Sequence, residues 1–241
     1  DLHSFPTRRS SDLNLLKCGS GSFMKNAADA KHLAEIMIEI GEFEGKRMAA
    51  LISDMSEPLG RAVGNSIEVI EAIEVLRGEG PADIEELSLQ LAGVMVHLGG
   101  RAESVEEGVE LAGEVLKEGR GLEKFAGLIE AQGGNPEVCR DTSLLKTACV
   151  SKEVIADTCG YIGIIDGETV GTASVHAGAG REKKGDAIDS GAGILLERKV
   201  GDFVETGDKL ATVYASNEEK AADAAAKTEV EIGRASCRER V

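Results

Sequence analysis

The chain has 241 residues, with 43 acidic and 27 basic side chains, so its net charge at neutral pH is −16, and 42% of its residues are hydrophobic. This composition is typical of a globular protein of one or two domains. Such a negative charge repels nucleic-acid phosphates and anionic lipid head groups, and no long basic stripe interrupts it between residues 14 and 232. We therefore expect neither a nucleic acid nor a membrane as a partner.

The sequence also lacks the signals of export. No run approaches the roughly 18 consecutive apolar residues of a membrane-spanning helix, and the N-terminal residues lack the apolar stretch of a secretory signal. We interpret the protein as cytoplasmic. Its five cysteines show no Cys-x-x-Cys spacing, which disfavours a zinc site or a disulfide framework and predicts reduced thiols.

Both ends of the chain differ from the rest. Residues 1–13 show no helical or strand periodicity, and residues 233–241 are abruptly basic after an acidic stretch. Both look like non-native, translated adapter sequence, with ordinary disordered tails as the alternative. If they are not native, the natural protein extends further upstream, and we expect this chain to be a fragment of it.

The first part of the credible sequence has the pattern of an α/β unit. An apolar run that ends at Cys18 is followed by a Gly-Ser-Gly turn at 19–21, a helix-period stretch and a second apolar run at 48–53. Strand, helix and strand in this order are typical of a parallel sheet covered by helices. The helical stretch is expected to bury a face made of Leu33, Ile36, Met37 and Ile40.

A loop with two glycines at 57–64 comes next. Asn65 or Ser66 is placed to cap a helix that runs to Leu76. Two or three further helices are expected before the helix-rich region ends near Pro136.

The sequence pattern changes after Lys146. Short β-branched runs at 160–167 and 193–201 are separated by glycines, a spacing that predicts a small all-β unit. The segment at 200–210, with its two Gly-Asp turns, is similar to the barrel-sandwich modules of biotinyl and lipoyl domains. An alanine-rich segment at 216–228 is expected to form a final helix.

These patterns together predict an α/β fold in two parts. A truncated parallel-sheet α/β domain is expected over 14–145. It is followed by a small C-terminal β barrel-sandwich module, which with the final helix makes an α+β unit over 146–232. The stretches at 1–13 and 233–241 are left out of both parts.

Three motifs occur in a fixed order along the chain. They are Lys-Cys-Gly-Ser-Gly-Ser-Phe-Met at 17–24, Ile-Ser-Asp-Met at 52–55 with Pro-Leu-Gly-Arg-Ala-Val-Gly-Asn at 58–65, and Gly-Ala-Gly-Arg at 178–181. Each motif alone is weak, but the ordered set resembles the pyrimidine-nucleoside and thymidine phosphorylase family. The resemblance implies a pentosyltransferase that catalyses reversible phosphorolysis of uridine, thymidine or deoxyuridine to the free base and a (deoxy)ribose 1-phosphate.

The resemblance also implies where the functional residues lie. In the family, the segments that bind phosphate and most of the pyrimidine are upstream of the first motif, so we expect this chain to be the C-terminal half, inactive alone, and to form a homodimer when full length. No catalytic residue is assigned within it. Phe23 matches the position that forms a wall of the base pocket. A potassium ion would be held by the carbonyls of Leu59 and Ala62 and by the carboxylate of Glu71.

Each of these assignments has a simpler alternative. Phe23 is otherwise a core side chain under the following helix, and Glu71 a solvated helix carboxylate. The turn at 19–21 either presents backbone N–H groups to an anion or is a plain connection between strand and helix. His32, His97 and His176 share no spacing with a carboxylate or thiol that would mark a triad or metal cluster.

Two other functions fit parts of the sequence. A nucleoside monophosphate phosphorylase shares the family plan, and the upstream half would distinguish it. In a different class, the β segment would be a biotinyl or lipoyl carrier, and the chain a non-catalytic binding module. Such carriers present the modified lysine in Met-Lys-Met or Asp-Lys-Ala, and neither occurs at 146–215. We therefore favour the phosphorylase.

Overall fold

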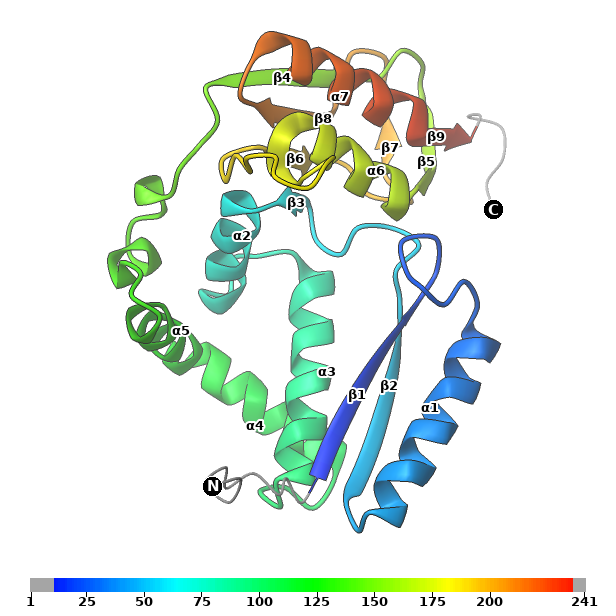
Figure 1. The fold of residues 1–241 in the computed structure, drawn as a ribbon, viewed down its shortest axis with the longest axis vertical. Helices are drawn as coiled ribbons and strands as arrows, with labels where there is room; N and C mark the ends of the chain where they lie inside the picture. The colour runs from blue at the N-terminus through cyan, green and yellow to red at the C-terminus, as the bar shows by residue number, and fades with distance from the viewer. Residues whose placement is uncertain (1–10, 236–241) are drawn as a thin grey trace.

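The structure, a computed structural model, describes residues 11–235. Most of the two end stretches at 1–13 and 233–241 thus lies outside the described residues. Helices and several sheets follow one another along the chain (Figure 1), so the mixed α/β class is confirmed.

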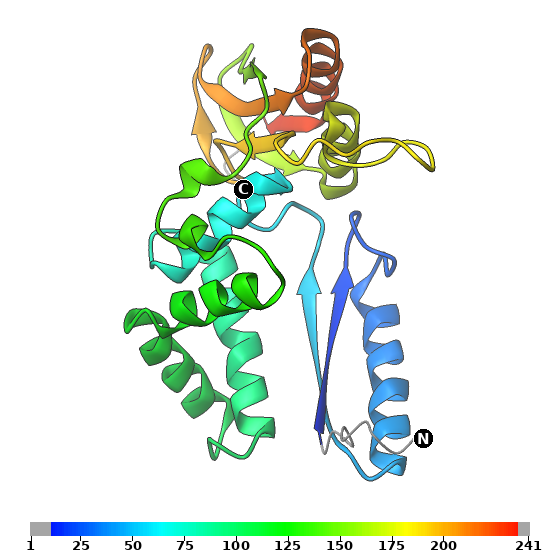
Figure 2. The same ribbon diagram turned by 60° about the vertical axis from the view of Figure 1, so that its left-hand side comes forward.

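A parallel pair of strands forms the first unit. β1 (Ser11–Cys18) and β2 (Arg47–Asp54) pair along their whole length and are connected by α1 (Ala27–Phe43). In Figures 1 and 2, α1 lies along one side of this pair and α3 (Ala82–Leu98) along the other. The predicted strand, helix and strand are confirmed.

β1 begins upstream of the apolar run that predicted it. Ser11 lies opposite Arg47 and Leu13 opposite Ala49 in the parallel ladder. Ladder hydrogen bonds involve only the backbone, so they extend a strand into sequence that has no apolar periodicity. Residues 11–13, which the sequence groups with the N-terminal stretch, therefore belong to a strand.

α1 turns small side chains toward the sheet. Ala30 and Ala34 are 0% and 4% exposed, and Leu33 packs beside them. The predicted buried face is wrong for Ile36 and Ile40, which are 40% and 62% exposed. Alanine lets the helix backbone lie close to the strands, and the rotation that achieves this turns the isoleucines outward.

Helices fill the middle of the chain. The helix after the glycine loop begins and ends where predicted, and three more account for those expected before Pro136. They are α2 (Ser66–Leu76), α3, α4 (Val105–Lys117) and α5 (Arg120–Ala131), followed by short 3-10 turns at Pro136–Cys139 and Thr142–Leu144. No helix in residues 11–235 combines the length and the apolar character needed to cross a bilayer.

Two sheets form the C-terminal part. The first has four strands in the order β3 (Ala62–Gly64), β6 (Gly193–Leu196), β8 (Lys209–Ala215) and β4 (Val150–Ile155). The second has the order β7 (Phe203–Val204), β5 (Gly160–Ile165) and β9 (Ile232–Ala235). Two helices, α6 (Gly167–Ser174) and α7 (Glu218–Glu231), pack on the first sheet.

This arrangement corrects one expectation and confirms another. α6, continued by a π-helical turn at Val175–Ala179, lies within the segment predicted to be all-β. α7 confirms the final helix. No closed barrel forms among the described residues, and the barrel-sandwich description stays a prediction.

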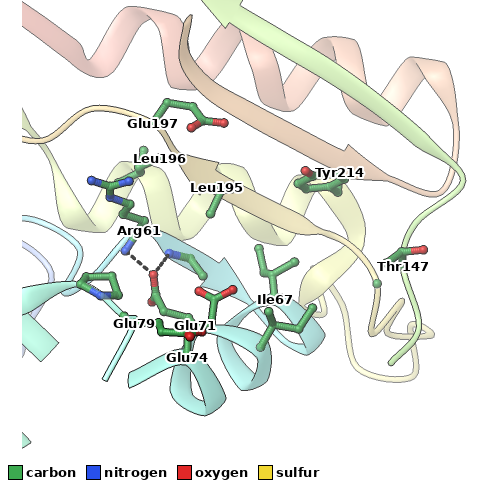
Figure 3. A pocket seen from close by; sticks show the side chains of 15 residues that line it. Arg61, Ile67, Glu71, Glu74, Glu79, Thr147, Leu195, Leu196, Glu197 and Tyr214 are labelled. Atoms are coloured by element: carbon green, nitrogen blue, oxygen red, sulfur yellow. Dashed lines mark hydrogen bonds between the residues drawn. The ribbon is translucent and has the colours of Figure 1, made fainter. Parts of the chain in front are cut away.

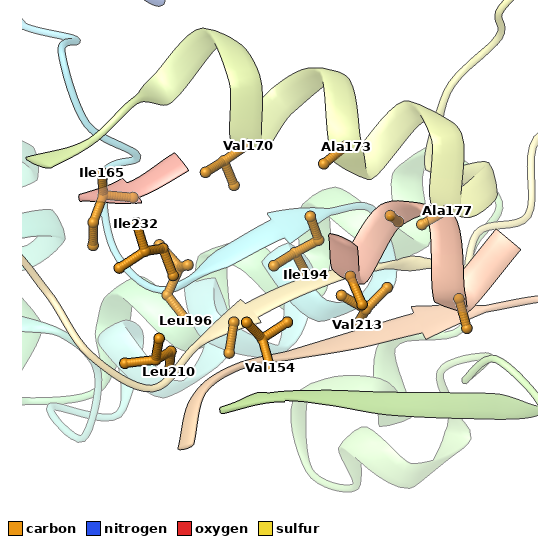
Figure 4. Packing of buried hydrophobic residues seen from close by; sticks show 14 of the residues in the cluster. Val154, Ile165, Val170, Ala173, Ala177, Ile194, Leu196, Leu210, Val213 and Ile232 are labelled. Atoms are coloured by element: carbon orange, nitrogen blue, oxygen red, sulfur yellow. The ribbon is translucent and has the colours of Figure 1, made fainter. Parts of the chain in front are cut away.

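The largest hydrophobic core lies between these helices and the sheets (Figure 4). Ile194, Leu196 and Val213 of the first sheet are fully buried, as are Val170 and Ala173 of α6. Such close packing fixes the positions of the backbone around it. β3 belongs to this sheet although the residues on either side of it belong to the first part of the chain, so the chain crosses between its two parts near Ala62.

Candidate functional site

The loop at 57–62 enters β3 through a tight turn at Gly60. The φ angle of Gly60 is +67°, a conformation that favours glycine. The Gly60 N–H donates to Asp83 Oδ2 of α3 at 2.9 Å. The next two amides, of Arg61 and Ala62, donate to Glu71 Oε1 at 2.8 and 3.1 Å (Figure 3). Carboxylates from two helices thus hold three consecutive N–H groups of the loop.

Glu71 is buried against this loop. Its residue exposure is 6%, so the alternative of a solvated helix carboxylate is wrong. Burial raises the pKa of its carboxyl, the amides of Arg61 and Ala62 partly offset this, and the charges of Asp83 and Glu74 raise it further. A cation beside Glu71 would stabilise its ionised form.

The Ala62 carbonyl points to the side on which Glu71 lies. Ala62 stands opposite Leu195 of β6, whereas the preceding Arg61 carbonyl accepts from the Leu196 N–H at 2.8 Å. Because hydrogen-bonded and non-bonded pairs alternate in an antiparallel ladder, the N–H and C=O of Ala62 both point away from β6. The N–H meets Glu71, and the carbonyl faces the same side.

The structure therefore brings Ala62 and Glu71 together, with Leu59 in the same short loop. Among the described residues, no hydrogen bond is made to the Leu59 carbonyl, and no group of three or more His, Cys, Asp or Glu side chains is arranged to hold a metal. A metal here has to use backbone carbonyls with one carboxylate. That donor set fits a hard monovalent cation, which takes oxygen ligands.

A cavity of about 440 Å³ lies beside Glu71, between α2 and the first sheet of the C-terminal part (Figure 3). Ala62 and Arg61 line it on the loop side, and Leu195 and Tyr214 line it on the sheet side. The loop thus lies where the two parts of the chain meet.

Lys199, which lies in none of the three sequence motifs, also contacts this loop. It lies between β6 and β7, and its Nζ donates to the carbonyls of Pro58 and Gly60. Its partners are 139 to 141 residues away in the sequence, so no local pattern could have identified it.

Phe23 lies apart from the loop, on the turn after β1. It is 93% exposed, so the alternative of a core phenylalanine is wrong. With Leu16, Leu33 and Met37 it lines an open hollow of about 470 Å³ between β1 and α1. An exposed ring beside an apolar hollow is a surface on which a flat ligand can lie.

Both glycine amides of the Gly-Ser-Gly turn, and the Ser22 amide after it, donate to backbone carbonyls. The Gly19 N–H donates to the Met24 carbonyl at 3.0 Å, Gly21 to Met55 at 3.0 Å, and Ser22 to Gly19 at 3.1 Å. These N–H groups are not directed at an anion, so the geometry favours the plain connection.

Comparison with known proteins agrees with the motifs. A family model described as the pyrimidine nucleoside phosphorylase C-terminal domain matches residues 161–234, and one described as the a/b domain of a glycosyl transferase family matches residues 8–122. Two similar proteins are the pyrimidine-nucleoside phosphorylases of Geobacillus stearothermophilus and Bacillus subtilis, each 44% identical over 204 and 203 residues.

These alignments cover 85% and 84% of this chain and 47% of each relative, so the chain spans about half the length of the curated relatives it matches. The two family models match both parts of the chain, in the order in which the three motifs occur. The chain belongs to the pyrimidine-nucleoside phosphorylase family.

Proposed function

We propose that the protein is a pentosyltransferase that catalyses reversible phosphorolysis of pyrimidine nucleosides, namely uridine, thymidine or deoxyuridine, to the free base and a (deoxy)ribose 1-phosphate. The observation that carries this proposal is the 44% identity, over 85% of the chain, to a protein named pyrimidine-nucleoside phosphorylase. The names of these relatives favour nucleosides over nucleoside monophosphates as substrates. They also favour an enzyme over a biotinyl or lipoyl carrier.

The reaction places definite demands on a site. Cleavage of an N-glycosidic bond passes through a sugar with cationic character, so phosphate must be held beside the anomeric carbon while the leaving base is oriented. Within this chain, Phe23 supplies an exposed flat surface for the base. The 241-residue chain alone is expected to show no measurable phosphorolysis, because the groups that hold phosphate are assigned to sequence upstream of residue 17.

The test joins the upstream half of the Geobacillus stearothermophilus relative to this chain at the start of the aligned segment. We expect phosphate-dependent release of base from uridine or thymidine by the joined protein and none by the chain alone. Phe23→Ala in the joined protein should raise KM by about 10-fold or more, since an aromatic contact contributes about 1.5 kcal/mol or more. No base release by a joined protein that folds would overturn the proposal.

We also propose that potassium binds at Leu59, Ala62 and Glu71. The convergence of the Ala62 carbonyl and the Glu71 carboxylate supports it. A bound cation supplies positive charge beside a buried carboxylate and cross-links the loop to α2. It stabilises the folded state by mass action, so its binding can be measured without any assay of activity.

Glu71→Gln tests this site. In the joined protein, raising potassium should raise the melting temperature of the parent and do so much less in the variant, because Gln lacks the charge but has similar helix propensity. Tetramethylammonium at equal ionic strength controls for screening. Equal potassium-dependent shifts in parent and variant would remove Glu71 from the site.

Two further assignments belong with this proposal. We propose that the full-length protein is a homodimer and that it functions in the cytoplasm, with nucleoside and phosphate as its small-molecule partners and no membrane or nucleic-acid partner. The net charge of −16 supports the last point. Sedimentation of the joined protein tests the oligomeric state.

A further inference from the structure

Lys199 is the least expected contact of the loop at 57–62. Its side chain is 21% exposed, and its Nζ donates to the Pro58 carbonyl and, at 2.9 Å, to the Gly60 carbonyl. Asp83 Oδ2 lies 3.3 Å from the same Nζ and Glu57 Oε2 lies 3.7 Å from it. One ammonium group therefore meets two carbonyls and two carboxylates.

The carbonyls of the loop are divided between two sides. Those of Pro58 and Gly60 are held by Lys199, and that of Arg61 by the Leu196 N–H. Both donors, the Lys199 ammonium and the Leu196 N–H, come from β6 or from the segment just after it. The carbonyls of Leu59 and Ala62 are left for another ligand.

Lys199 neutralises the carboxylates that surround the loop. Burial opposes ionisation of Asp83, but the Gly60 N–H and Lys199 outweigh it and lower the pKa of Asp83. Glu57 Oε2 is buried and accepts no hydrogen bond from residues 11–235, so the Lys199 ammonium 3.7 Å away compensates its charge. Without a cation at this position, two carboxylates would face each other across a loop that a third, Glu71, also contacts.

We propose that Lys199 is a positioning residue for the cation site: it holds the Pro58 and Gly60 carbonyls on the side of the C-terminal sheet, so that the Leu59 and Ala62 carbonyls are presented to the ion. This inference rests on the proposed potassium site. It makes the ion affinity of a loop in the first part of the chain depend on a residue of the C-terminal part.

The first test uses the 241-residue chain and involves no potassium. Hydrogen exchange of the Arg61 and Ala62 amides, which donate to Glu71, reports how firmly the loop is held. Lys199→Met should speed their exchange and Lys199→Arg should restore most of the protection. Lys209→Met is the matched control, because Lys209 pairs with Glu153 at 2.5 Å in the same part of the chain. Unchanged exchange in a folded Lys199→Met variant would overturn the proposal.

The second test measures ion affinity in the joined protein. Melting temperature is followed against potassium concentration, with tetramethylammonium holding the ionic strength constant. Lys199→Met should weaken the apparent affinity by about 10-fold or more, the usual cost of losing a group that orients metal ligands, while Lys209→Met should not change it. If the melting temperature of Lys199→Met rises with potassium as much as that of the parent, the proposed role of Lys199 is overturned but the potassium site is not. No response in the parent overturns the potassium site and, with it, this role.

Discussion

Gly60 meets two separate requirements at the centre of the loop. Its φ of +67° lies in the left-handed region, and a Cβ at this position would lie 2.5 Å from Glu71 Oε2 and closer still to Ile84 Cδ1. The left-handed conformation costs other residues about 1–2 kcal/mol, and the close contacts add a steric cost. The loop can pass this near to Glu71 only because residue 60 has no side chain.

Gly60→Ala should therefore destabilise the chain by about 2–4 kcal/mol, as the sum of backbone strain and overpacking. Gly45→Ala is the control, because Gly45 has a similar φ of +73° but no atom within 4 Å of the place that a Cβ would occupy. Gly45→Ala should lower the free energy of unfolding by only about 1 kcal/mol. Urea unfolding of both variants measures the difference, and equal losses would contradict the steric argument.

The candidate site could be predicted only where its residues lie close together in sequence. Leu59, Ala62 and Glu71 fall within one motif and the helix after it, so a resemblance carried by that motif located all three. Lys199 could not be predicted, because its significance depends on carbonyls 139 to 141 residues away. The exposure of Phe23 could not be predicted from the sequence either, since an isolated apolar residue after a glycine turn fits a core position equally well.

At the scale of elements, a single ion pair fastens the connection between the helices and β4. Lys146 Nζ lies 2.6 Å from Asp189 Oδ1, and that oxygen also accepts from the Gly191 N–H at 3.1 Å. The hydrogen bond from Lys146 lowers the pKa of Asp189 below its ordinary value of 3.8 and outweighs the effect of burial. The pair thus joins the segment before β4 to the segment before β6.

This pair predicts a pH dependence with a definite sign. A carboxyl whose pKa is lower in the folded state stabilises that state above its unfolded pKa, and the contribution is lost as the pH falls through the folded pKa. The difference in unfolding free energy between the parent and Asp189→Asn should therefore be constant above about pH 5 and shrink below pH 3.8. Because Lys146 is 61% exposed, this difference in unfolding free energy should be about 1 kcal/mol or less. A difference that does not change down to pH 2 would contradict the assignment.

Elements were predictable where periodicity is strong and were missed where distant contacts form them. α2 and α7 follow clear apolar or alanine patterns. α6 contains Gly, Thr and Val, which are poor helix formers. It depends on a cap in which the Thr169 N–H donates to Asp166 Oδ1 at 2.8 Å, and on the complete burial of Val170 and Ala173. β3 has three residues in a glycine-rich loop, and only its pairing with β6 makes it a strand.

At the scale of the whole molecule, the unit of β1, α1 and β2 exposes an unusual amount of apolar surface. Phe23 is 93% exposed, Phe43 is 89% and Ile40 is 62%. Among the described residues, no further strand pairs with the outer edge of β1 or β2, and β1 makes only an isolated bridge there, between Cys18 and Met24. Open sheet edges and apolar patches favour association.

The 241-residue chain should accordingly associate as its concentration rises. Static light scattering should show a mass that increases with concentration, and Phe43→Glu should reduce the increase by adding a charge at the end of α1. Leu144→Glu is the control, because Leu144 is 53% exposed outside this unit. A constant monomer mass up to high concentration would show that these side chains do not drive contact.

The position of β3 has a consequence for the order in which the protein can assemble. During synthesis, β3 and the loop before it leave the ribosome long before β6 and Lys199, so the strand must wait unpaired while the helices α2 to α5 form. A nascent or cleaved chain that stops before Gly193 contains Leu59, Ala62 and Glu71 but lacks the donors that orient their loop. If Lys199 positions the loop as proposed, a chain that has been made through the C-terminal sheet should bind the cation more tightly than one that ends before it.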